Sequence, residues 1–383
     1  MGLKARIDYL VKHNKVANRV FIGAGSAVLR FVGFFIPIKE NAILFSSLSR
    51  KYNDSPKEIY ETMIRDPLYK DMEYYWAVDD INTQIPGKHK IIKCDTMGYF
   101  IISQKCKYWV TCVNIERGLH YKKRKTRYLN TWHGTPIKSI SGDDLYKNNF
   151  SYIDIFCCSG SFEREVFKHA FSVPDEHLLF SGLPRNDALY HYEKELIPKI
   201  KRKINIPDNK KVILYAPTWR DSNDGGKTYS VKPPINIAKW KKELSQEYVV
   251  LFRTHPNTNK LMGIEFDDFV IDVTKYPQIN DLLIVSDILI SDYSATIFDY
   301  SILERPIISF AYDYNEYKSS RGFEVDPINV LGENVLFSED DVLKKIENMS
   351  YKEECRKVQE IKNQYLEYGG NATRMCIEAL LSE

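Results

Sequence analysis

The chain has 383 residues, of which 44% are hydrophobic and 27% charged, so it can form two globular domains with separate cores. Its formal net charge of +3 is too small to predict a nucleic-acid-binding protein, and we expect no nucleic-acid partner. Its seven cysteines include no Cys-x-x-Cys pair, so we expect the reduced thiols of a cytosolic protein and no zinc site.

The first 40 residues combine basic side chains with the most apolar segment of the chain. The segment 20–38 has the length of a membrane span, but Arg30 within it argues against spanning. Basic residues followed by apolar and aromatic ones are typical of a segment that lies in the anionic cytoplasmic leaflet. We therefore predict a peripheral, monotopic anchor over residues 1–40 on the cytoplasmic face of the cell membrane. An ordinary buried helix is the alternative, and no signal peptide is expected because no small-residue cleavage site follows.

From residue 41 onward, short apolar runs alternate with helical segments. One helix should begin at Ser55, which forms a capping box with Glu58. Alternating strands and helices predict a parallel sheet with right-handed crossovers, and we assign it to a first domain, 41–205. The expected strands are 42–45, 74–78, 89–94, 108–113, 126–132, 153–158 and 178–180.

The alternation restarts after the charged segment 193–209, which predicts a second doubly wound domain over 206–383. Charged helices at 340–382 are expected to pack back on the first domain. Ligands of such sheets bind outside the carboxyl ends of the strands, so two facing domains predict a cleft between them. The expected strands are 212–215, 249–252, 269–271, 288–290 and 307–310.

Polar or cationic side chains follow four of these strands, a pattern that suits a phosphorylated ligand. Ser294 and Thr296 should begin a helix, where free N–H groups and the helix dipole attract anions, although a plain N-cap is the alternative. Arg253 and His255 add donors suited to a diphosphate. The residues after the four strands are His133, Gly134 and Thr135; Thr218 and Arg220; Arg253 and His255; and Asp292, Ser294 and Thr296.

His133 lies between an apolar strand and a Gly-Thr-Pro turn, which favours a general base that reaches a cleft. Such a base contributes roughly a hundredfold to ten-thousandfold in rate. A core histidine bonded to a backbone carbonyl is the alternative. The basic run 122–125 precedes the same strand and suits either a lipid headgroup or acceptor phosphate, or simply a solvated loop.

Taken together, these motifs resemble the CDP-glycerol glycerophosphotransferases, the primase- and polymerase-type enzymes of wall teichoic acid synthesis in Gram-positive bacteria. The similarity runs in the same order from about residue 42 to the tail, and it rests on the combination of motifs rather than on any one. The motifs are Asn130–Pro136, Ala216–Arg220, Arg253–Pro256, Ser291–Tyr300 and Glu304–Pro306.

The resemblance implies an α/β, GT-B-like fold, with a membrane-associated acceptor domain followed by a domain that binds a CDP-alditol. It implies transfer of glycerol phosphate from CDP-glycerol to a hydroxyl of a polyprenyl-diphosphate-linked saccharide or growing polymer, with release of CMP. His133 matches the family's catalytic histidine, and we assign His255 as the second catalytic residue, at a donor-phosphate position. The substrate-binding positions are Gly134, Thr135, Thr218, Arg220, Arg253, Asp292, Ser294, Thr296 and Arg321.

Two departures from the family pattern narrow the expectation. Ala295 stands where many relatives carry a second Ser, so one donor is missing. The long amino-terminal region of the large polymerases is absent, which favours a primase or short-chain transferase.

Alternatives are a CDP-ribitol transferase, a capsule-polymer transferase, a GT-B glycosyltransferase that uses a sugar nucleotide, and a non-catalytic membrane scaffold for anionic polymer. We expect no metal site and no required Mg²⁺, because no acidic metal cage is evident. The sequence leaves open whether the chain forms a homo-oligomer.

Overall fold

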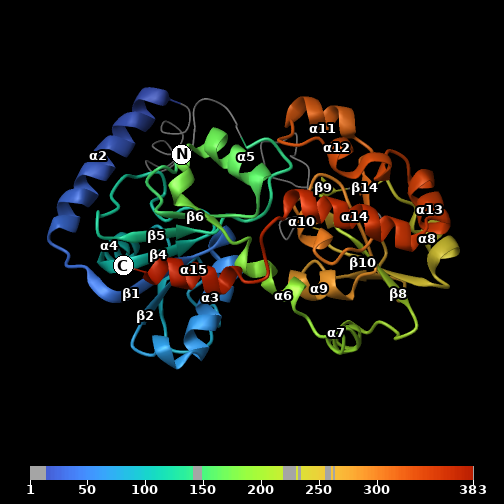
Figure 1. The fold of residues 1–383 in the computed structure, drawn as a ribbon, viewed down its shortest axis with the longest axis horizontal. Coiled ribbons are helices and arrows are strands. Elements are labelled where there is room, and N and C mark those ends of the chain that lie inside the picture. Colours follow the sequence, from blue (N-terminus) through green and yellow to red (C-terminus); the bar gives the residue numbers. More distant parts are fainter. Residues whose placement is uncertain are drawn as a thin grey trace.

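The computed structural model describes residues 14–140, 149–218, 230–231, 234–254, 260–261 and 264–382. Two parallel α/β sheets lie side by side, the first formed by the blue and green part of the chain and the second by the yellow and orange part (Figure 1). The expected α/β class with two Rossmann-like units is therefore confirmed.

The first sheet has seven parallel strands in the order β3-β2-β1-β4-β5-β6-β7. Its central strands are buried because helices cover both faces, which explains their nearly continuous apolar sequence. The expected strand 126–132 ends early, at Asn130, because the Asn130 side chain accepts from the Trp132 N–H at 2.8 Å and Trp132 has a φ of 55°. The strands are β1 Lys39–Ser46, β2 Glu73–Val78, β3 Lys90–Lys93, β4 Cys106–Thr111, β5 Arg127–Asn130, β6 Ile155–Cys158 and β7 Leu178–Phe180.

Helices α3 Asp54–Arg65, α4 Met97–Lys105 and α5 Ser161–Phe171 accompany this sheet. The predicted capping box at Ser55 is wrong, because α3 begins one residue earlier and Ser55 is fully buried. Its hydroxyl accepts instead from the backbone N–H of Arg185 at 3.3 Å, in the short 3-10 helix η5 Pro184–Asn186. A tertiary contact has replaced the local one.

The second sheet has six parallel strands in the order β12-β10-β8-β13-β14-β15, and a separate pair joins β9 Ser230–Val231 to β11 Lys260–Leu261. The six strands are β8 Lys211–Tyr215, β10 Tyr248–Phe252, β12 Val270–Asp272, β13 Ile288–Ser291, β14 Ile307–Phe310 and β15 Val335–Leu336. The helices of this half are α8 Ile237–Leu244, α9 Ile279–Val285, α10 Thr296–Ser301, α11 Tyr314–Ser320, α12 Pro327–Leu331, α13 Glu339–Asn348 and α14 Tyr351–Tyr365.

The chain crosses between the two sheets twice. It first passes through α6 Asp187–Tyr190 and α7 Leu196–Ile204, and α7 packs on α9 of the second half. It returns after α14 to α15 Ala372–Leu381, which lies on the first sheet beside α3 (Figure 1). The Asp187 carboxylate accepts from the N–H groups of Ala372 and Thr373 at 3.0 and 2.8 Å, so the outgoing segment caps the returning helix.

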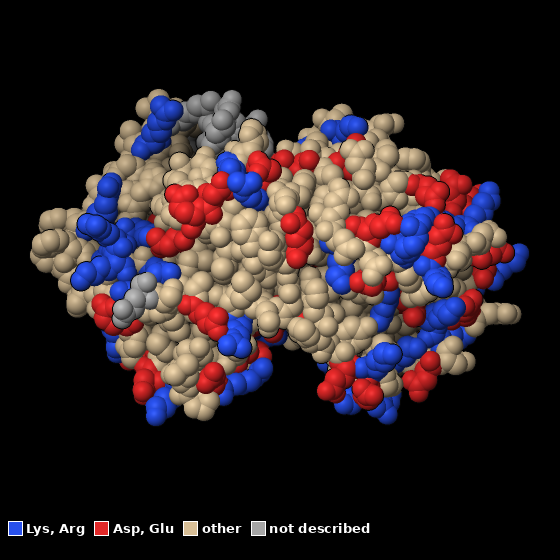
Figure 2. All heavy atoms as spheres, viewed as in Figure 1, with Lys and Arg blue, Asp and Glu red and all other residues tan. Residues whose placement is uncertain are grey.

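Helix α2 Lys15–Phe34 runs along the outside of the first half (Figure 1). Ser26, Leu29 and Gly33 face the protein, whereas Phe31 and Phe34 are 70% and 85% exposed. Within the described residues it is the one helix long and apolar enough to cross a membrane, and only 17% of that window is buried. An ordinary buried helix is therefore excluded. Lys and Arg side chains also gather over this edge of the molecule (Figure 2).

Candidate active site

His133 lies in a tight turn directly after β5. Its neighbours Trp132 and Gly134 have φ angles of 55° and 133°, and the Trp132 ring lies 4.1 Å from the imidazole, centroid to centroid. His133 Nδ1 lies 2.8 Å from the backbone carbonyl of Cys112, beyond the end of β4. Because a carbonyl can only accept, Nδ1 carries the proton of the neutral ring, which leaves the lone pair on Nε2.

The surroundings of His133 favour that neutral ring. Burial lowers its pKa, and the Arg185 cation lowers it further, while the Cys112 carbonyl and the Asp54 carboxylate partly oppose the shift. The net direction is downward from the ordinary value, so the imidazole is unprotonated at neutral pH. A base in this state accepts a proton without first having to lose one.

The turn that carries His133 touches the second sheet's half of the molecule at Ala295. A Cβ added to Gly134 would lie only 2.8 Å from the Cβ of Ala295, so the two backbones approach as closely as glycine allows. Ala295 separates Ser294 from Thr296 at the start of α10. Two stretches that are more than 150 residues apart in the sequence, 133–135 and 294–296, thus meet at one point.

On the second half, Thr218 and Asp292 form one unit and Ser294 and Thr296 another. The Thr218 N–H donates to Asp292 Oδ1 at 2.9 Å, and the Thr218 hydroxyl donates to the same oxygen. The Ser294 hydroxyl donates to Thr296 Oγ1 at 3.0 Å and accepts from the Thr296 N–H at 3.2 Å. Ser294 therefore binds the N–H of the first residue of the six-residue helix α10, whose N-cap is Ala295, and its use for anion binding stays a prediction.

The predicted arginines differ in their surroundings. Arg253 Nη1 donates to the carbonyls of Val273 and Tyr276 at 3.1 and 2.8 Å, and burial lowers its pKa. Arg321 is exposed at the end of α11, beside a bridge in which Ser139 N–H donates to the Gly322 carbonyl at 3.2 Å. Arg220 and His255 lie outside the described residues.

Thr135 is buried and holds the turn, and its use for substrate binding stays a prediction. Its hydroxyl donates to Glu163 Oε1 at 2.6 Å, and Glu163 Oε2 accepts from the Ser159 N–H at 2.5 Å. Glu163 is buried at the start of α5, and burial raises its pKa. The carboxyl group thus fixes the chain two residues after His133.

Sequence reasoning missed Arg185, Asp54 and Asp299, which join in a buried ion cluster beside His133. Arg185 donates to Asp54 Oδ2 at 2.8 Å and to Asp299 Oδ2 at 2.6 Å. Arg185 follows β7 at the same edge of the first sheet as His133, so the rule that polar residues at strand ends form sites would have found it. Asp299 lies within a helix and gave no such signal.

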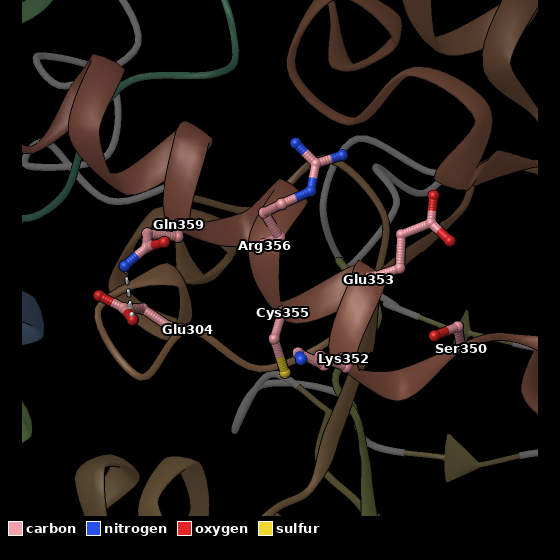
Figure 3. Close-up of a pocket in the computed structure, with 7 residues that line it drawn as sticks. All are labelled: Glu304, Ser350, Lys352, Glu353, Cys355, Arg356 and Gln359. Carbon is pink, nitrogen blue, oxygen red and sulfur yellow. Dashed lines mark hydrogen bonds between the residues drawn. The ribbon is translucent and has the colours of Figure 1, made fainter.

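A separate hollow of about 530 Å³ lies along α14, away from these residues (Figure 3). Gln359 there donates to Glu304 Oε2 at 3.2 Å, and none of the predicted site residues lines it. Within the described ranges, no three His, Cys, Asp or Glu side chains gather as metal ligands. The expectation that the reaction requires no Mg²⁺ stays a prediction. The lining residues are Glu304, Ser350, Lys352, Glu353, Cys355, Arg356 and Gln359.

Known proteins with similar sequences are transferases and polymerases of teichoic acid synthesis. The chain is 34% identical over 311 residues to a teichoic acid glycerol-phosphate transferase of Staphylococcus aureus, covering 75% of this chain and 78% of that protein. It is 35% identical over 308 residues to a teichoic acid poly(glycerol phosphate) polymerase of Staphylococcus epidermidis, covering 75% of this chain but 42% of that protein.

A solved structure of the wall teichoic acid polymerase TagF matches with a TM-score of 0.81 and 28% identity, covering 99% of this chain and 98% of that one. A TagF variant soaked with CDPG also matches, with a TM-score of 0.81 and 28% identity over 99% of this chain and 98% of that one. The family model of CDP-Glycerol:Poly(glycerophosphate) glycerophosphotransferase matches residues 28–381. The expected family and the expected pair of Rossmann-like domains are thereby confirmed, and the chain belongs to the CDP-glycerol:poly(glycerophosphate) glycerophosphotransferase family.

Proposed function

We propose that this chain transfers glycerol phosphate from CDP-glycerol to an acceptor hydroxyl and releases CMP. One observation carries the proposal: the turn bearing His133, with an unprotonated Nε2, touches the Ser294–Thr296 turn of the other half. The family match and the similarity to the TagF variant soaked with CDPG support CDP-glycerol as the donor. Glycerol-phosphate enzymes match at 29–35% identity and ribitol-phosphate enzymes at 25–26%, which favours glycerol over ribitol.

In the proposed mechanism, the acceptor oxygen attacks the phosphorus that carries glycerol. His133 Nε2 takes the hydroxyl proton, a new P–O bond forms, and the bond to the leaving phosphate breaks, so that CMP departs with the electron pair. Arg253, His255 and the Ser294–Thr296 turn offset the negative charge of the diphosphate and of the leaving group. Such electrostatic stabilisation is usually the largest contribution to reactions of this type.

The proposed acceptor is a polyprenyl-diphosphate-linked saccharide or growing chain on the cytoplasmic face of the membrane. Support comes from α2, whose exposed Val20, Phe31 and Phe34 would enter the lipid interface while Arg19 and Arg30 stay near anionic headgroups. We further propose that few units are added, as a primase or short-chain transferase does. The S. aureus relative of which this chain covers 78% is named a transferase, whereas a Bacillus spizizenii relative covered to 86% is named a polymerase, so the product masses decide the number of units.

Product analysis with purified full-length chain tests the proposed function. The chain is incubated with a lipid-linked disaccharide acceptor and CDP-glycerol, CDP-ribitol or a UDP-sugar, and released nucleotide and product masses are measured. We expect CMP only from CDP-glycerol and products heavier by one or a few glycerol phosphates. Release of UDP from a sugar donor, or no release from any donor, would refute the proposal.

A further inference from the structure

Arg185 bridges the two halves of the molecule at the edge of the candidate site. Its Nη1 donates to Asp54 Oδ2 at 2.8 Å, and its Nη2 donates to Asp299 Oδ2 at 2.6 Å. Asp54 opens α3 on the first sheet, whereas Asp299 lies on α10 of the second half. The three side chains are 16%, 7% and 13% exposed, so water screens this bridge little.

The chain around Arg185 is also held from both sides. Its N–H donates to the Ser55 hydroxyl of α3, and its carbonyl accepts from Asn280 Nδ2 of α9 at 2.6 Å. Asn186 Nδ2 donates to the second oxygen of Asp299 at 2.7 Å. Both Asp299 oxygens are therefore bound by the turn that follows β7.

This bridge lies against both turns of the candidate site. A Cβ at Gly134 would lie 3.1 Å from Arg185 Nη2 and 2.8 Å from Ala295 Cβ, so Gly134 fits between them. Asp299 stands on the helix that begins directly after Ala295. The planar guanidinium fork thus fixes one short path between the His133 turn and the start of α10, a geometry that lysine cannot reproduce.

We propose that Arg185 is a positioning residue, an interdomain clamp that holds the His133–Gly134 turn at its working distance from the Ser294–Thr296 turn. Asp54 and Asp299 are its two anchors. The kinetic consequence rests on the proposed function, because the clamp sets the distance from the base to the donor phosphorus. Arg185 itself takes no proton in the reaction.

Two variants test the clamp: Arg185→Gln, and Asp299→Asn, which is isosteric, removes the carboxylate charge that pairs with Arg185, and leaves one oxygen for the two donors Arg185 and Asn186. Arg164→Gln is the matched control, because Arg164 binds Asp175 at 2.8 Å through two nitrogens on the exposed surface of the first half. A misplacement of about 1 Å costs on the order of a hundredfold in rate, so we expect kcat to fall by that factor with little change in donor KM. The Arg164 variant should match the wild type.

Hydrogen exchange provides a readout that needs no activity. In both clamp variants, we expect faster amide exchange in peptides covering 133–140 and 294–301. The effects of the two changes should be less than additive in the double variant, because both changes act on the Arg185–Asp299 contact. If Arg185→Gln does not fold, Asp299→Asn carries the test. Unchanged exchange and kcat in a folded variant would overturn the clamp. If the clamp variants show the expected faster exchange but the wild-type protein releases no CMP, the proposed function is refuted and the clamp is not.

Discussion

His133 combines a fixed tautomer with a lowered pKa, and each has its own cause. The Cys112 carbonyl places the proton on Nδ1, while burial and the Arg185 cation disfavour the charged ring. A histidine bonded to a backbone carbonyl was the structural alternative to a catalytic role, yet here that same bond directs the lone pair to Nε2. The two interpretations are therefore compatible.

The lowered pKa of His133 predicts the pH dependence of the reaction. A general base works only when it is deprotonated, so kcat/KM should rise as the pH increases through the pKa of His133 and then level off. Because burial lowers that pKa below the ordinary histidine value, the rise should lie below about pH 6.5 and neutral pH should fall on the plateau. A pH profile with the CMP-release assay measures this, and a rise centred above pH 7 would contradict the assignment.

At the scale of elements, the strands could be predicted from sequence and the contacts around them only in part. Buried parallel strands are continuous apolar runs, so β1, β8 and β13 were recognisable from composition alone. The rule that polar residues follow strand ends also located the His133 turn. It could not supply the partner of Arg185, because Asp299 is 114 residues away in the sequence, nor the role of Ser55, whose local pattern indicated a cap.

Helix α2 gives the prediction at this scale. Replacing Phe31 and Phe34 with Ser should weaken binding to vesicles that contain anionic lipid by at least tenfold, because burying a large apolar side chain contributes roughly 1.5–3 kcal/mol. Leu68→Ser is the control, since Leu68 is 76% exposed but lies far from α2 in the sequence, after α3. Cosedimentation measures the binding. Equal binding of the double variant and the control would show that α2 does not attach the protein to lipid.

At the scale of the whole molecule, the site exists only where the two halves meet. The Gly134–Ala295 approach, the Arg185 bridge and the pairing of 137–139 with 322–324 all join the two halves. Sequence motifs predicted which stretches carry the chemistry, but their meeting depends on how two separately folded sheets pack. That packing is set by contacts such as Asn186 with Asp299, which no local pattern encodes.

The central claim, that His133 is the base at this junction, is tested most directly with His133→Asn. The asparagine side-chain amide can still donate to the Cys112 carbonyl, so the turn should keep its shape. Asparagine has no atom at the position of Nε2, so the proton acceptor is lost. CDP-glycerol affinity by calorimetry and CMP release at saturating acceptor are measured on the same preparation. We predict unchanged donor affinity and a loss of turnover between about a hundredfold and ten-thousandfold. Wild-type turnover in this variant would contradict the account.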